Sequence, residues 1–434
     1  MPPHHVPEPS HSEHPGRQKL AIALAVLAVM PGLAIRVTGS HPEPLLAAIC
    51  FGLAVIGGAF MLAWAAEVAQ LDISAGLAIA LLALIAVLPE YAVDFVFTWK
   101  AGDTFGENGS CVTSDGTNHC DNALANMTGG NQLLIGIGWS LVVILAAYRI
   151  RQARKGKVER IPPGTDLTTT DVKLERSHAV EISFLVLATI YGLTLPFKES
   201  LTLFDSAVLV TVFVLYMFRV ARAPAEEPHL VGPAQLIGAL PVAQRRAALA
   251  ALGLGAVIVI LAVAEPFAES LVSVGEEFEI NEFVLISIVA PLASEAPELL
   301  VAALFAWRLN TNAGLGTLVS SKVNQWTLLV GTLPIVFAIA SASTHGLPIG
   351  SVQREELWVT AAQSAFAVAV LLNRSMSVTE AVTLFVLYIG NLISRIFPES
   401  IHDEARIGVG AIYIVLAVIV IIRNRRSVRP LLTD

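Results

Sequence analysis

The strongest constraint on the fold of this chain is a succession of long apolar stretches. A helix that crosses a bilayer needs about 20 mostly apolar residues, and such stretches occupy most of the 434 residues. Only 14% of the residues are charged, whereas soluble domains carry about a quarter. We therefore predict an all-α fold, a polytopic transmembrane helical bundle of about 12 spans. The expected spans are 20–38, 45–70, 73–99, 121–148, 179–196, 201–221, 247–270, 282–307, 313–340, 355–372, 377–397 and 406–423.

Basic residues are concentrated in a few of the connections between these spans. Lysine and arginine mark the cytoplasmic side of a membrane protein. Twelve spans place the basic 149–176 and 222–246 connections and both termini on one side. We therefore expect an integral membrane protein of the plasma membrane with both termini cytoplasmic. Cys111 and Cys120 share a loop on the outer side, where an oxidising compartment would permit a disulfide between them.

Two stretches of the sequence resemble each other. Each has a Pro-Glu pair, then an Asn-Gln pair, and then a glycine seven residues beyond the asparagine. The copies are Pro89-Glu90, Asn131-Gln132 and Gly138, and Pro297-Glu298, Asn324-Gln325 and Gly331. Equivalent spans are an odd number of spans apart, so the two copies have opposite orientations. Inverted repeats are typical of secondary transporters, which bind substrate near the membrane midplane.

The repeat predicts two inverted five-helix repeats with one extra span at each end. A tail rich in His and Pro should be disordered, because it has few apolar residues to bury. The expected units are the tail 1–18, an extra span 19–40, a first repeat 45–222 with an external loop 100–120, a cytoplasmic linker 223–246, a second repeat 247–397 and an extra span 405–424.

Several ionisable residues lie inside the predicted spans, where a charge is costly and marks a functional site. In the first copy Glu90 follows Pro89, and Asp94 lies on the same helical face. In the second copy Ser294, Glu295 and Glu298 lie beside prolines. Proline frees nearby carbonyl oxygens, and hard cations prefer oxygen ligands. We interpret these residues as cation ligands; the alternative is that they are protonated or paired structural residues.

Asn131, Asn324 and Lys322 are further polar residues in these helices. The asparagine amide oxygens could bind a dehydrated ion, or the side chains could form hydrogen bonds between helices. Lys322 would repel a bound metal ion. It is either the counterion of a nearby carboxylate or a residue that couples transport to a proton.

These residues resemble the cation/calcium antiporter superfamily, which includes the sodium/calcium exchangers. Each repeat of that family has a Gly-Thr-Ser-x-Pro-Glu-like motif and, in the next helix, a Gly-Asn-x-x-Gly-Ser-Asn-like motif. The two Pro-Glu pairs match the end of the first motif, and Asn126, Gly129 and Asn131 match the second. The resemblance covers about residues 45–397. It implies that Glu90 and Glu298 form the central ion site, completed by Asn131, Asn324 and neighbouring polar atoms.

The sequence also departs from the family motifs. Ala86-Val87 replaces Thr-Ser in the first copy, Ser294-Glu295 replaces it in the second, and Lys322-Val323-Asn324 replaces the second Gly-Ser-Asn. The first change removes two oxygen donors and the second adds a carboxylate. A site with fewer hydroxyls and a built-in lysine differs from one that binds calcium and several sodium ions.

The resemblance implies a secondary-active cation antiporter of the sodium/calcium exchanger type. Calcium, sodium and/or protons would be transported, with no cofactor. Within this class a proton-coupled calcium or sodium antiporter is the alternative, and a cation channel is the alternative from another class. The sequence contains no His-Glu-x-x-His or Gly-x-Ser-x-Gly motif that would indicate an enzyme. The expected partners are small cations and the lipid bilayer, with no nucleic acid and no assigned oligomeric state.

Overall fold

The structure is a computed structural model that describes residues 15–69, 71–72, 88–114, 116–158, 161, 165–222, 230–278, 282–394 and 399–424. Most of the predicted tail 1–18 therefore lies outside the described residues. So do the first part of the predicted span 73–99 and residues 223–229 of the predicted linker.

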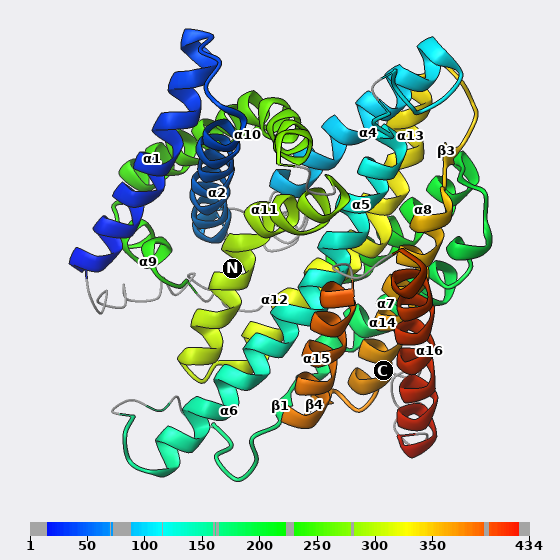
Figure 1. Cartoon of the computed structure of the whole chain (residues 1–434). Coiled ribbons are helices and arrows are strands. Elements are labelled where there is room, and N and C mark those ends of the chain that lie inside the picture. The colour runs from blue at the N-terminus through cyan, green and yellow to red at the C-terminus, as the bar shows by residue number, and fades with distance from the viewer. Residues whose placement is uncertain are drawn as a thin grey trace.

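The described residues form an almost entirely helical bundle, which confirms the predicted fold class (Figure 1). Each predicted span overlaps a helix of the described chain, and the short α9 lies in the predicted linker 223–246. The helices are α1 (Pro15–Thr38), α2 (Pro44–Ala69), α4 (Leu88–Asn108), α5 (His119–Leu133), α6 (Ser140–Arg154), α7 (Ala179–Gly192), α8 (Leu203–Val220), α9 (Pro233–Gly238), α10 (Val242–Glu277), α11 (Glu282–Trp307), α12 (Thr311–Asn324), α13 (Val330–Ala340), α14 (Ser351–Leu371), α15 (Val378–Ser394) and α16 (Glu399–Arg423).

Nine helical segments of the described chain are long and apolar enough to cross a membrane. Many of their large apolar side chains are exposed, as on α10 and α16, and lipid is the solvent that suits such a surface. The other predicted spans fall on α4, α14 and α15. These helices carry more charged residues or, for α15, are shorter.

Two of the long helices contain a π-helical turn at equivalent places. The segment η1 (Leu134–Trp139) joins α5 to α6, and η4 (Gln325–Leu329) joins α12 to α13. Both turns lie at or just after the repeated Asn-Gln pair. Such turns occur frequently at functional sites. The two copies found in the sequence thus share a local backbone feature as well as a motif.

The bundle has two flanks that meet at a central pair of helices. Figure 1 shows α1, α2 and α10 on one side and α14, α15 and α16 on the other, with α11 and α5 between them. α5 and α11 approach very closely, because a Cβ atom built on Gly129 would lie 2.0 Å from the Ser287 carbonyl oxygen. Glycine at this position is therefore required for the central contact.

An ion pair joins the segment just after α2 to the first turn of α10, at the side of the bundle predicted to face the cytoplasm. The Nε and Nη2 atoms of Arg245 each donate to a carboxylate oxygen of Asp72 at 2.8 Å. These hydrogen bonds hold the pKa of Asp72 below its ordinary value. A bidentate pair has a defined geometry. It therefore holds the start of α10 in a fixed position relative to the end of α2.

Two short antiparallel strand pairs connect the first and second halves of the chain. β1 (Val172–Lys173) pairs with β4 (Ser375–Met376), and β2 (Ser200–Leu201) pairs with β3 (Leu347–Pro348). Each pair joins a connection from the first predicted repeat to one from the second. The two halves are therefore tied together outside the central helices as well.

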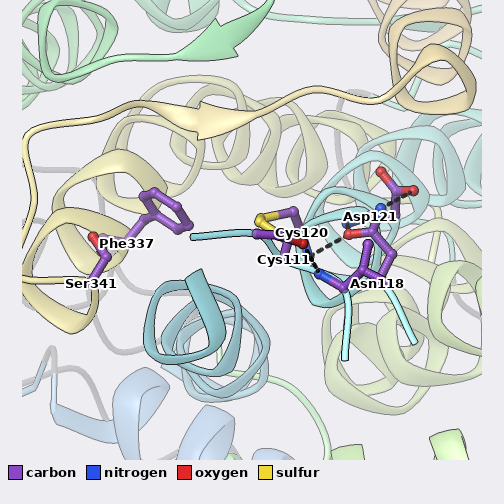
Figure 2. Close-up of a disulfide and its surroundings, with 8 residues drawn as sticks. Cys111, Asn118, Cys120, Asp121, Phe337 and Ser341 are labelled. Atoms are coloured by element: carbon purple, nitrogen blue, oxygen red, sulfur yellow. Dashed lines mark hydrogen bonds between the residues drawn. A yellow bond between two sulfur atoms is a disulfide. The ribbon is translucent and has the colours of Figure 1, made fainter. Parts of the chain in front are cut away.

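A disulfide closes the loop between α4 and α5. It joins Cys111 and Cys120 (Figure 2). The side-chain oxygen of Asn118 accepts hydrogen bonds from the backbone N–H groups of Cys120 and Asp121, and so caps the start of α5. The loop thus sets the position of the helix that carries the repeated Asn-Gln pair.

Candidate cation-binding site

Two acidic side chains from different halves of the chain meet at the centre of the bundle. The Nε2 atom of Gln325 donates to Glu295 Oε1 at 2.9 Å and to Glu90 Oε2 at 3.3 Å. Glu90 comes from α4, Glu295 from α11 and Gln325 from η4. All three side chains are buried. One amide group therefore bridges two carboxyl groups inside the membrane-spanning region.

Gly130 on α5 provides the space in which these carboxyl groups approach each other. A Cβ atom built on Gly130 would lie 2.9 Å from Glu295 Oε1 and 3.1 Å from Glu90 Oε1. Any larger side chain at this position would press on both groups. Gly130 and Gly129 thus have separate roles, since Gly129 permits the contact between helices.

The other two predicted acidic ligands flank this centre, each with its own partner. Ser321 Oγ donates to Glu298 Oε2 at 2.6 Å, and Asn126 Nδ2 donates to Asp94 Oδ1 at 2.6 Å. The sequence motif assigned the central position opposite Glu90 to Glu298. In the structure the amide of Gln325 joins Glu90 to Glu295, and Glu298 is half-buried with Ser321 of α12 as its hydrogen-bond partner. Glu295 and Glu298 are three residues apart and lie on one face of α11, so both remain candidate ligands.

Lys322 is fully buried and is held by the first half of the chain. Its Nζ atom donates to Asn131 Oδ1 at 2.5 Å and to the Asn131 backbone oxygen at 3.0 Å. It also lies 4.9 Å from the centre of the Trp326 ring. Asn131, predicted as an ion ligand, thus presents its oxygens to Lys322.

The remaining predicted ligands are buried beside the centre. Ser294 Oγ donates to the backbone oxygens of Ala290 and Pro291, at 3.2 Å each, within its own helix. Asn324 is buried on α12, directly before Gln325. Ser294 and Asn324 are thus buried next in sequence to Glu295 and Gln325, and Gln325 is the amide that contacts both carboxyl groups.

The sequence interpretation missed two glutamines. Gln325 bridges the carboxyl groups, and its counterpart in the first copy, Gln132, donates from Nε2 to Glu356 Oε2 and to Thr360 Oγ1, both at 2.9 Å. The repeated Asn-Gln pair was the available signal, but only its asparagines were considered as ligands. Both glutamines donate a hydrogen bond to a buried glutamate, so the two copies share this contact as well as the sequence pair.

A buried ion-pair network surrounds Glu356 and was also missed. Arg406 on α16 has its Nη1 atom 3.5 Å from Glu356 Oε1 and its Nη2 atom 2.7 Å from Asp403 Oδ1. Its Nε atom lies 3.2 Å from Glu355 Oε2. The sequence interpretation began the last span at Arg406, whereas α16 begins at Glu399 and buries this arginine.

The central oxygens have free acceptor capacity. Glu90 Oε1, Glu295 Oε2 and Gln325 Oε1 are buried without a hydrogen-bond partner among the described residues. Carboxylate and amide oxygens are the ligands that Ca²⁺ takes. No three His, Cys, Asp or Glu side chains of the described chain converge closely enough to hold a metal ion alone. A cation at this centre would therefore use the amide oxygen and backbone or water oxygens as well.

Comparisons with known proteins show the family and the fold of the chain. The model of the family described as sodium/calcium exchanger protein matches residues 44–221 and 248–397, which is most of the chain. The chain belongs to this family. Its members are transporters, so the chain is an integral membrane cation exchanger rather than an enzyme, and it carries ions without a cofactor. The family expectation from the sequence is thus confirmed.

Two solved structures show how far the similarity extends. The crystal structure of an H⁺/Ca²⁺ exchanger, CAX, is 36% identical over 96% of this chain and 97% of its own, with a TM-score of 0.84. The Ca²⁺/H⁺ antiporter protein YfkE is 14% identical over 91% of this chain and 99% of its own, with a TM-score of 0.59, and so shares the fold. No curated protein sequence matched the chain.

The central contact predicts which glutamates are essential. Glu90→Gln and Glu295→Gln should each abolish calcium transport, because either change removes half of the charge that balances a divalent ion. Glu298→Gln should keep measurable transport with a weaker apparent affinity. The measurement is calcium uptake into proteoliposomes that contain equal amounts of folded exchanger.

The matched control for these variants is Glu269→Gln, since Glu269 is more than half exposed and pairs with Lys100 at 2.7 Å. It should transport like the unaltered exchanger. Full loss in Glu298→Gln together with activity in Glu295→Gln would restore the assignment made from the motif.

The Arg406 network predicts a large effect on stability. Arg406→Met leaves Glu356 buried without its arginine, and breaking a buried ion pair costs roughly 3–5 kcal/mol. The melting temperature of the purified protein in detergent should fall clearly. Arg423→Met, at the exposed end of the same helix, should leave it unchanged, and adding Glu356→Gln to Arg406→Met should recover part of the loss. Equal melting temperatures for all variants would contradict a stabilising network.

Proposed function

We propose that this exchanger is a proton-coupled calcium antiporter that works by alternating access. The observation that carries the proposal is the pair Glu90 and Glu295, buried and bridged by one amide group. Two carboxylates inside the membrane need their charge balanced. One Ca²⁺ ion can do so, and so can two protons, so binding of one species excludes the other.

The similarity to CAX supports protons as the counter-ion. That exchanger is described as H⁺/Ca²⁺, and the two chains are 36% identical over nearly their whole lengths. The sodium/calcium type, which the sequence resemblance placed first, has the family model as its support. The departures from the family motifs at Ala86-Val87 and Val323 favour the proton-coupled type, because they remove hydroxyl oxygens that sodium ions would need.

The predicted inverted repeats, 45–222 and 247–397, would supply the two access states. Glu90 and Glu295 belong to different repeats, so rocking of one repeat against the other would open the shared centre to each side in turn. A channel would need a continuous water path and no counter-ion. The close contact between α5 and α11 at Gly129 favours an exchanger.

Flux measurements separate these functions. Proteoliposomes with an acidic interior and no sodium should accumulate calcium, because outward proton movement drives inward calcium movement. A sodium gradient imposed without a pH gradient should drive no uptake, and Glu90→Gln vesicles should show none in either condition. Uptake driven by sodium alone would establish the sodium-coupled type, and uptake that needs neither gradient would indicate a channel.

We further propose that the exchanger lies in the plasma membrane with both termini in the cytoplasm. The disulfide between Cys111 and Cys120 supports this orientation, because disulfides persist in oxidising compartments. The basic 149–176 connection supports it as well.

Thiol labelling of intact cells tests the orientation. In a Cys50→Ala background, a membrane-impermeant maleimide should label the protein only after treatment with an impermeant reductant. The Cys111→Ser/Cys120→Ser variant in that background should not be labelled at all. Labelling that requires permeabilised cells would place this loop in the cytoplasm and reverse the proposed topology.

A further inference from the structure

Lys322 is a basic residue buried beside the carboxyl groups at the centre of the bundle. Its side chain is fully buried. The nearest partners of its ammonium group are two oxygens of Asn131, at 2.5 and 3.0 Å, and the face of Trp326, at 4.9 Å from the ring centre. Oxygens and an aromatic face are the surroundings that a monovalent cation prefers.

The ammonium group also lies within electrostatic range of the central carboxyl groups. Lys322 precedes Gln325 by three residues, and the Gln325 amide contacts Glu295 of α11 and Glu90 of α4. Asn131 belongs to α5, in the first half of the chain, and Lys322 to α12, in the second. The Nζ atom of Lys322 thus lies where helices of both halves meet beside the candidate site.

We propose that Lys322 is a tethered monovalent cation that occupies the place of a sodium ion and makes calcium binding insensitive to sodium. The inference rests on the proposed function, because it explains why this site would hold one divalent ion in exchange for protons. The lysine acts in two ways: its charge opposes a second cation nearby, and its ammonium group takes up the Asn131 oxygens that such a cation would need.

Two substitutions separate the charge of Lys322 from the space that it fills. Lys322→Ala removes the charge and opens the space beside the Asn131 oxygens, so a sodium ion can enter. Lys322→Met removes the charge but fills most of the space with an apolar chain, so sodium should stay excluded. The double variant Lys322→Ala/Asn131→Leu opens the space but removes the side-chain oxygen, and should lose most of the acquired sodium binding.

The measurement is equilibrium binding of radioactive calcium to the purified full-length exchanger, with sodium chloride or choline chloride at the same ionic strength. The unaltered protein should bind calcium equally in both salts. Lys322→Ala should bind it about tenfold more weakly in sodium than in choline, which corresponds to about 1.4 kcal/mol. Lys100→Ala, which removes a lysine from the surface pair with Glu269, serves as the control and should behave like the unaltered protein.

Several results would overturn the proposal. Sodium competition in the unaltered protein would do so without any variant. Equal calcium binding in the two salts by folded Lys322→Ala would also overturn it. So would loss of calcium binding by this variant in both salts, because Lys322 would then be required for calcium binding. A sodium effect of the same size in Lys322→Met would assign the selectivity to charge alone.

The binding assay uses no gradient, so its result does not depend on which ion drives transport. An exchanger whose calcium uptake fails to respond to a pH gradient would disprove the proposed function. The sodium sensitivity of Lys322→Ala would still report on the place that the lysine fills. The two proposals can therefore fail separately.

Discussion

An ionisable group buried inside a membrane protein must be stabilised by polar groups around it. This requirement organises the whole central region. Each buried ionisable side chain contacts a polar partner from another helix. The pairs are Glu90 and Glu295 with Gln325, Asp94 with Asn126, Glu298 with Ser321, Lys322 with Asn131, and Glu356 with Arg406 and Gln132. Because the partners come from different helices, the pairing also fixes how the helices pack.

Glu356 is paired with an arginine, whereas the two central carboxyl groups share one neutral amide. Glu356 Oε2 accepts a hydrogen bond from Gln132 Nε2 at 2.9 Å, and Glu356 Oε1 lies 3.5 Å from the Nη1 atom of Arg406. Glu90 and Glu295 share a single amide and keep buried oxygens without a partner among the described residues. Leaving buried acceptors unsatisfied costs stability. An exchanger needs that cost at its binding site, because a fully satisfied centre would have no reason to bind an ion.

The sequence predicted much of this arrangement. Glu90 was recognisable because an acidic residue after a proline in an apolar run has few structural explanations. Lys322 was recognisable because a lysine in a predicted membrane span is also rare. The motif pointed to Glu298 as the partner of Glu90, whereas the residue that shares an amide with Glu90 in the structure is Glu295. The two glutamates share a helical face, and helix packing decides which of them meets Gln325. Arg406 at the edge of an apolar run resembled an interfacial residue, and its burial depends on how α16 packs against α14.

The π-helical turns in the two long helices have a consequence for how their surfaces are arranged. An extra residue in one turn rotates everything after it by about 100° relative to a regular α-helix. The stripe of side chains that faces the ions in α5 and α12 therefore does not continue along α6 and α13, where a different stripe faces inward. A helical wheel drawn through either whole helix would mix the two stripes, and each half of these helices has its own inner face.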